Sequence, residues 1–314
     1  MPEVVARGNR FHVQVLDPAG PTSPDGLADR AEAANRADGA EGTVVVFLHG
    51  LVMDNLSSFY YTLAAPVAEA GARVVLYDLR GHGRSGRTPT GYGVADAVAD
   101  LFAVLDALGE RRPVHLVANS FGGVIALNAA LARPARVAGL VLVEAYGPSE
   151  RPAEWTESML NTLGKAALVL EYERLADQLL SVGWRRHGRQ AATADALVNG
   201  TSLLEDLAAV DPVPPAALAA LSCPVLAVYG EHSDVGEAGR LLRRCVPDCT
   251  LHTLAGHAHS VLSEGTAELL EVILPWLSDH AGTRSPAARP GPVGSGPAGS
   301  GALRTAVLSG GAAR

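Results

Sequence analysis

The feature that most constrains the fold is an alternation of two kinds of segment between residues 43 and 280. Short apolar runs rich in Val and Leu are followed by longer stretches, rich in Ala and Leu, with apolar residues at helical spacing. Short continuous apolar runs are typical of strands buried on both faces, and the longer stretches are typical of helices packed against them. The alternation therefore predicts an α/β fold with a mostly parallel sheet flanked by helices.

The expected elements follow directly from this pattern. The strands are predicted at Thr43–Leu48, Arg73–Tyr77, Val114–Ala118, Val137–Val143, Pro224–Tyr229 and Thr250–Leu254, with an earlier alternating strand at Phe11–Leu16. The helices are predicted at Ser58–Ala70, Val94–Leu108, Phe121–Arg133, Val235–Cys245 and Thr266–Ser278.

Three segments interrupt the alternation and suggest the domain organisation. Pro18–Gly42 is rich in Ala, Gly, Asp and Pro and reads as an insertion between early strands. Residues 146–215 contain helical patches but no strand signal, which predicts a helical lid inserted into a core formed by residues 1–145 and 216–280. Residues 281–314 are dominated by Gly, Pro, Ala and Ser, and this composition predicts a disordered C-terminal tail.

Composition narrows the class of function. The 314 residues are 48% hydrophobic and carry a formal net charge of -8, which disfavours a nucleic-acid partner. No run approaches the ~20 apolar residues of a membrane span, and no signal peptide is visible, so a cytoplasmic protein is expected. Three cysteines imply no disulfide framework, and neither a metal nor an organic cofactor is expected.

The residues that carry chemistry begin with Ser120. A buried strand runs directly into Asn119-Ser120-Phe121-Gly122-Gly123, and a helix is expected to begin at once. A serine at such a sharp turn projects its hydroxyl from the sheet edge, while the helix N-terminus places partial positive charge beside it. This arrangement is a nucleophile elbow with Ala118 in place of its usual first glycine. The alternative role for Ser120 is a helix N-cap.

With these residues the chain resembles the α/β-hydrolase superfamily over approximately residues 10–280. The resemblance also includes His49-Gly50-Leu51 after the first long strand and the run from Tyr77 to Ser85 after the next one. It implies an eight-stranded, mostly parallel sheet with a helical lid after the sixth strand. It further implies an oxyanion hole formed by the backbone N–H groups of Leu51 and Phe121.

The resemblance places the catalytic acid and base after the nucleophile, in the order Ser, Asp, His. Asp234, which follows the apolar strand ending at Tyr229, is the preferred acid, with Glu231 as a near rival. Glu144 is a second alternative, because some members of the family carry the acid at the end of the preceding strand.

Two histidines compete for the role of base. The Gly-His pair favours His257, whereas a glutamate five residues later, as family members often have, favours His259. The pattern prefers His259 and leaves His257 as the alternative base, to be decided by geometry.

The sequence therefore predicts a serine hydrolase that cleaves a carboxylic ester, thioester or lactone of a small hydrophobic metabolite through an acyl-enzyme. Its partner would be a small-molecule acyl substrate, free or bound to a carrier. A C–C bond hydrolase and a non-hydrolytic lyase or cyclase on the same fold remain alternatives. A small-molecule receptor with residual hydrolase activity is a further one, because fold alone does not set function.

Overall fold

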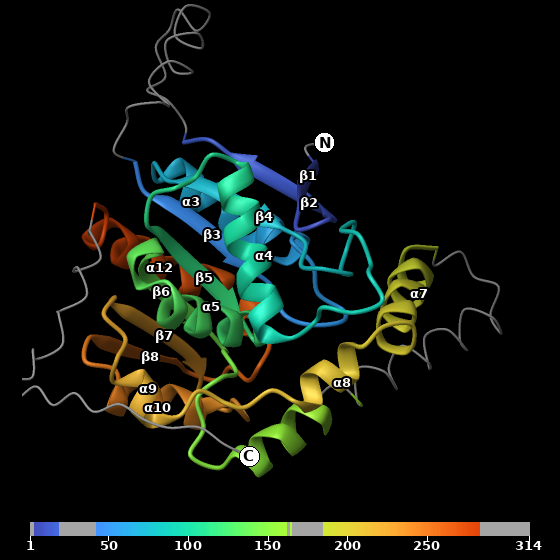
Figure 1. Cartoon of the computed structure of the whole chain (residues 1–314). Coiled ribbons are helices and arrows are strands. Elements are labelled where there is room, and N and C mark those ends of the chain that lie inside the picture. Colours follow the sequence, from blue (N-terminus) through green and yellow to red (C-terminus); the bar gives the residue numbers. More distant parts are fainter. Residues whose placement is uncertain (1–2, 19–41, 162–163, 165–184, 283–314) are drawn as a thin grey trace, which may run out of the picture.

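The computed structural model describes residues 3–18, 42–161, 164 and 185–282. At its centre lies a sheet of eight strands in the order β1-β2-β4-β3-β5-β6-β7-β8 (Figure 1). The pairings of β1 with β2 and of β2 with β4 are antiparallel, and all the others are parallel. The predicted mostly parallel, eight-stranded α/β fold is confirmed.

Seven strands lie where the sequence predicts them, to within two residues at either end. The strands are β1 Glu3–Ala6, β2 Asn9–Leu16, β3 Val44–Leu48, β4 Arg73–Tyr77, β5 Val114–Asn119, β6 Val137–Val143, β7 Val225–Gly230 and β8 Cys249–Leu254. The exception is β1, which has only four residues and alternates between exposed and buried positions. It joins β2 through Arg7 and Gly8, whose positive φ angles of 50° and 74° are those of a tight hairpin.

Helices cover both faces of the sheet (Figure 1). The helical elements of the core are α2 Ser57–Phe59, η1 Tyr60–Ala64, α3 Ala65–Glu69, α4 Val94–Ala107, α5 Phe121–Ala132, η2 Pro134–Arg136, α10 Gly236–Cys245, α11 Val261–Glu264 and α12 Thr266–Asp279. On one face, α5 packs against β5 and α4, and α10 packs against β7 and β8. On the other face, α3 contacts β4 and α12 contacts β7.

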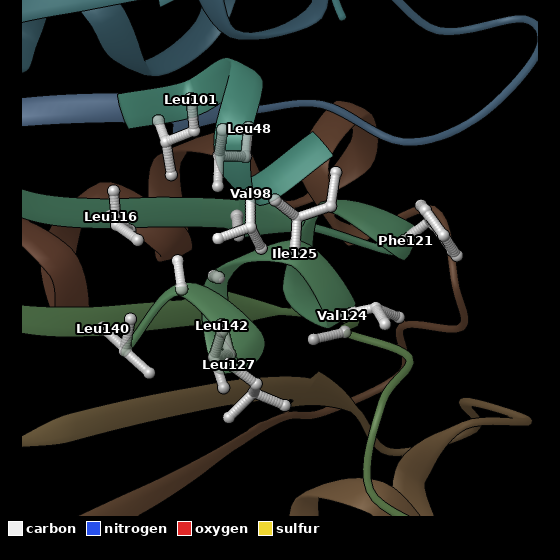
Figure 2. Close-up of a cluster of buried hydrophobic side chains, with 14 of the residues drawn as sticks. Leu48, Val98, Leu101, Leu116, Phe121, Val124, Ile125, Leu127, Leu140 and Leu142 are labelled. Atoms are coloured by element: carbon white, nitrogen blue, oxygen red, sulfur yellow. The ribbon is translucent and has the colours of Figure 1, made fainter. Parts of the chain in front are cut away.

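The buried side chains form two clusters because successive residues of a strand point to opposite faces of the sheet. In β3, Val44, Val46 and Leu48 belong to one cluster, whereas Val45 and Phe47 belong to the other. Figure 2 shows part of the first cluster, in which strand residues meet residues of α4 and α5. Burial on both faces explains why these strands are continuous apolar runs.

The described parts of the insertion between β6 and β7 include several helices. Residues 152–161 are helical, and α7 Arg185–Asn199, α8 Leu203–Ala208 and α9 Pro215–Leu218 follow. Residues 162–163 and 165–184 of the predicted lid lie outside the described residues, as do most of the insertion at 18–42 and nearly all of the predicted tail. Among the described residues no helix has both the length and the apolar character needed to cross a membrane.

Candidate active site

Ser120 occupies a strained turn between β5 and α5. Its φ of 54° and ψ of -121° lie in a region that residues with a side chain rarely adopt. Two backbone hydrogen bonds tie this turn to the end of β6: Ser120 N donates to Val143 O at 3.1 Å, and Tyr146 N donates to Ser120 O at 3.0 Å. Strain of this kind is retained where the surrounding structure fixes it, often at functional sites.

The glycines after Ser120 permit a close approach of α5 to the sheet. A Cβ on Gly122 would lie 2.2 Å from the carbonyl oxygen of Leu48, and a Cβ on Gly123 would lie 2.3 Å from the Cβ of Ala145. Ala118, which replaces the usual first glycine of the elbow, is fully buried in the core. Its methyl group is therefore accommodated without opening the turn.

The turn after β3 reaches the same place. A Cβ added to Gly50 would lie 3.4 Å from the Cβ of Ser120, and Leu51 directly follows Gly50 in the chain. Phe121 is the first residue of α5, where backbone N–H groups lack partners within the helix. Of the residues predicted to form the oxyanion hole, Phe121 thus follows Ser120 directly and Leu51 follows the glycine that approaches it.

Two buried histidines hold the turn after β3 in place. His49 Nε2 accepts a hydrogen bond from Leu79 N at 2.9 Å, and His82 Nε2 accepts one from Val52 N at 3.0 Å. Burial, reinforced by the proximity of His49, lowers the pKa of His82 to about 3. His82 is therefore a neutral acceptor at physiological pH, and it supports Val52, whose φ is 62°.

Of the two candidate bases, His259 lies beside the carboxylates. Its Nδ1 lies 2.9 Å from Glu144 Oε2 and 3.8 Å from Asp234 Oδ1. Only the shorter distance is a hydrogen bond. The hydrogen bond that the sequence predicts for Asp234 is therefore made by Glu144. The reason lies in the placement: Glu144 is buried at the end of β6, whereas 67% of the Asp234 side chain is exposed just before α10.

Glu144 is held by two further hydrogen bonds. Gly230 N donates to Oε1 and Ser233 Oγ donates to Oε2, each at 2.5 Å. The backbone of Glu144 has a φ of 49°, a second strained position at this edge of the sheet. No pattern in the sequence singles out Ser233, although it directly precedes the candidate acid Asp234.

The alternative base and the rival acid face elsewhere. His257 Nε2 lies 3.8 Å from Glu268 Oε1 on α12, and only 19% of its side chain is exposed. Glu231 accepts a hydrogen bond from Gly256 N at 3.0 Å through Oε2. The structure thus brings together Glu144, His259 and, less closely, Asp234.

Comparison with known proteins gives the family. A family model described as alpha/beta hydrolase fold matches residues 43–183. A protein of Variovorax paradoxus named as a carbamate hydrolase, RutD, is 32% identical over 237 residues, which cover 71% of this chain and 87% of that protein. The chain belongs to the α/β hydrolase family.

Two further proteins are similar to this chain, one in sequence and one in structure. The 2-hydroxy-6-oxo-2,4-heptadienoate hydrolase of Pseudomonas putida is 39% identical over 117 residues, which are 37% of this chain and 42% of that protein. A thermophilic esterase from Thermogutta terrifontis superposes with a TM-score of 0.64 at 18% identity. This alignment covers 89% of the chain and 98% of the esterase, and it shows a shared fold.

Two cavities are lined by residues of the candidate site or by their neighbours in the chain. The larger, of about 170 Å³, is lined by Tyr146, Trp155 and Asp234 among others, and the Tyr146 ring meets the His259 ring edge-on at 5.7 Å. The smaller, of about 30 Å³, is lined by residues that include Leu51 and Phe121. Within the described part of the chain, no group of three or more His, Cys, Asp or Glu residues is arranged to hold a metal ion.

Proposed function

We propose that this protein is a serine hydrolase that cleaves a carboxylic ester, thioester or lactone with Ser120, His259 and Glu144. One observation carries the proposal: the edge of the sheet that holds Ser120 in a strained elbow also holds His259 hydrogen-bonded to the buried Glu144. A histidine oriented by a carboxylate beside an elbow serine is the arrangement that activates a serine for attack on an acyl carbon.

In the proposed reaction, Ser120 Oγ attacks the acyl carbon while His259 Nε2 takes the hydroxyl proton. The oxyanion that forms is stabilised by the backbone N–H groups of Leu51 and Phe121. His259 then gives its proton to the departing alcohol or thiol, which leaves Ser120 acylated. A water molecule, deprotonated by His259, attacks the acyl-enzyme, and the acid is released as Ser120 regains its proton.

The choice of Glu144 over Asp234 as the acid rests on distance and burial. A charge that is shielded from water interacts more strongly with the imidazolium than an exposed charge does, because water screens the exposed one. Glu144 is fully buried and lies 2.9 Å from Nδ1, whereas Asp234 is largely exposed and lies 3.8 Å away. In this proposal, Gly230 N and Ser233 Oγ position Glu144, and Asp234 does not replace it.

A small-molecule acyl compound, free or attached to a carrier, suits the mechanism above. A C–C bond hydrolase is the second candidate, because the chain is 39% identical over 117 residues to a 2-hydroxy-6-oxo-2,4-heptadienoate hydrolase. The elbow residue Asn119 also favours it, since C–C hydrolases of this family often carry Asn-Ser there.

Labelling with a fluorophosphonate probe tests the proposal. The wild type and the Ser120→Ala, His259→Ala and His257→Ala variants are compared by intact mass, with circular dichroism to check the fold. We expect one adduct on the wild type and on His257→Ala, and none on Ser120→Ala or His259→Ala. A folded wild type that takes no adduct would count against an activated serine and favour a receptor role.

Kinetics with p-nitrophenyl acetate and with a vinylogous 1,5-diketone separate the two candidate activities. We expect the ester to be turned over and the diketone to be inert. Cleavage of the diketone at a higher kcat/KM than the ester would favour the C–C hydrolase instead.

A further inference from the structure

The turn after β3, residues 50–53, has its backbone N–H groups almost fully engaged. The N–H groups of Gly50, Val52 and Met53 donate to a carboxylate, an imidazole and a backbone carbonyl oxygen, at 2.7, 3.0 and 2.8 Å. Within the described residues the N–H of Leu51 has no acceptor. The turn therefore leaves one donor available, and it belongs to the residue that the proposed reaction uses to bind the oxyanion.

The conformation of this turn is strained at Val52. Its φ of 62° lies in the left-handed region, where a β-branched residue is an outlier. The hydrogen bond from Met53 N to Leu51 O closes a γ-turn around Val52, and a γ-turn with a positive φ is the rare, strained form. Such a turn persists only where its surroundings fix it, so the contacts of Val52 determine where the neighbouring Leu51 N–H points.

The contact that fixes the backbone of Val52 is made by His82. Its Nε2 lies 3.0 Å from Val52 N, and its Nδ1 lies 2.9 Å from the carbonyl oxygen of Arg80. A carbonyl oxygen can only accept, so Nδ1 carries the ring proton and Nε2 is left as the acceptor. Burial lowers the pKa of His82 to about 3, which keeps the ring neutral and Nε2 free to accept.

The loop after β4, which carries His82, is held on two sides. Leu79 N donates to His49 Nε2 at 2.9 Å, so this loop and the turn after β3 exchange reciprocal hydrogen bonds. A Cβ on Gly81 would lie 2.7 Å from Leu197 Cδ1, so the insertion packs closely against the loop. Because β3 lies between β4 and β5 and all three are parallel, the two loops and the elbow meet at one edge of the sheet (Figure 1).

We infer that His82 is a positioning residue of the hydrolase: by accepting the hydrogen bond of Val52 N, it orients the Leu51 N–H toward the oxyanion formed at Ser120. The inference rests on the proposed function, because it adds a residue to the same reaction. His82 contacts no reacting atom. Acylation and deacylation both pass through an oxyanion, so a misplaced donor should slow both steps and lower kcat while KM stays nearly unchanged.

Three substitutions of His82 test this role through the reach of the side chain. The amide oxygen of Gln reaches the place of Nε2, that of Asn reaches only the place of Nδ1, and Leu offers no acceptor. With p-nitrophenyl acetate, His82→Asn and His82→Leu should lower kcat by about 10- to 100-fold, less than the roughly 10²- to 10³-fold cost of losing a donor outright. His82→Gln should retain most of the wild-type kcat.

An inhibitor that itself forms an oxyanion separates positioning from a general loss of structure. A trifluoromethyl ketone adds to the serine hydroxyl and gives a hemiketal whose oxygen occupies the oxyanion hole. Across the His82 variants its inhibition constant should rise by the factor by which kcat/KM falls. His115→Leu is the matched control, because it removes another buried imidazole at the opposite end of β5 from Ser120, and it should keep the wild-type kcat and inhibition constant.

The outcomes separate this inference from the proposed function. A wild-type kcat in folded His82→Asn, or a His82→Gln variant as slow as His82→Asn, would overturn the positioning role and leave the serine mechanism intact. Should His82→Leu fail to fold, the comparison of His82→Gln with His82→Asn still decides, because both carry the same amide. A wild type that turns over no ester and takes no fluorophosphonate adduct would instead remove the proposed function itself.

Discussion

His259 Nδ1 and Glu144 Oε2 lie 2.9 Å apart, although the two residues are 115 positions apart in the chain. Glu144 directly follows β6, a central strand of the sheet, and its side chain is completely buried. The hydrogen bond joins the end of β6 to the loop after β8, across the end of β7. Asp234, which follows β7, is largely exposed and lies 3.8 Å from the same nitrogen.

This relationship predicts unequal effects of removing the two carboxylates. Glu144→Gln should lower kcat/KM by about 10³- to 10⁴-fold, because the imidazolium loses its buried counter-charge and the ring loses its fixed tautomer. Asp234→Asn should lower kcat/KM by less than about 10-fold, because an exposed charge is screened by water. The measurement is the steady-state hydrolysis of p-nitrophenyl acetate.

A matched control addresses the structural role of Glu144. Glu231→Gln alters a carboxylate in the same loop that does not contact His259, and it should leave kcat/KM unchanged. Thermal unfolding of all three variants checks that a loss of activity is not caused by a loss of folded protein. A larger effect from Asp234→Asn than from Glu144→Gln would contradict the proposed assignment of the acid.

Stability should fall as the pH drops below about 6.5. Burial is the main cause that lowers the pKa of His82 to about 3 and of His115 to about 4 in the folded protein. Between those values and 6.5 the unfolded chain binds more protons than the folded one, so protonation favours unfolding. In that window each histidine should lower the free energy of unfolding by up to ~1.4 kcal/mol for each unit by which the pH falls.

Urea unfolding at pH 7.5, 6.0 and 5.0 measures this slope. The His115→Met variant removes one of the two buried imidazoles, and its free energy of unfolding should fall less steeply between pH 6.5 and 5. His232, which is exposed, provides a control, and His232→Met should keep the wild-type slope. Equal slopes for the wild type and His115→Met would show that His115 does not titrate as expected.

The glycine after the elbow should tolerate no side chain. Gly122→Ala would place a Cβ 2.2 Å from the Leu48 carbonyl oxygen, a backbone atom that cannot move aside easily. Overpacking of this kind costs about 1–3 kcal/mol or more. Gly236→Ala is the control, because its nearest neighbour is a flexible arginine side-chain atom 3.7 Å away. Urea midpoints of the two variants should differ accordingly, and equal midpoints would refute the close approach.

Two aspartates on α4 should differ in their effect on stability. Asp100 is almost completely buried and binds both Arg80 and Arg7, so Asp100→Asn leaves buried guanidinium charge unpaired and should cost about 3–5 kcal/mol. Asp106 pairs with Arg136 on the surface, and Asp106→Asn should cost about 0–1 kcal/mol. Chemical unfolding of both variants checks this. A small loss for Asp100→Asn would mean that Arg80 finds another partner.

The local pattern of the sequence predicts most of the fold. Short apolar runs and helical stretches place seven of the eight strands and the long helices of the core within a few residues. The prediction omits β1, because four residues with an exposed valine carry little periodic signal and the pairing with β2 supplies the missing stability. The helix expected at Ser58–Ala70 contains a π-helical turn, η1, which no residue pattern in that stretch predicts.

The sequence by itself determined the α/β architecture, the elbow at Ser120 and the short set of acids and bases that could serve it. These depend on local spacing, which the chain carries along its own length. The tertiary structure decided that Glu144, rather than Asp234, bonds His259, and that Ser233 and Gly230 hold it. The choice depends on which carboxylate is buried within hydrogen-bond reach of the imidazole, and that follows from the packing of three loops from distant parts of the chain.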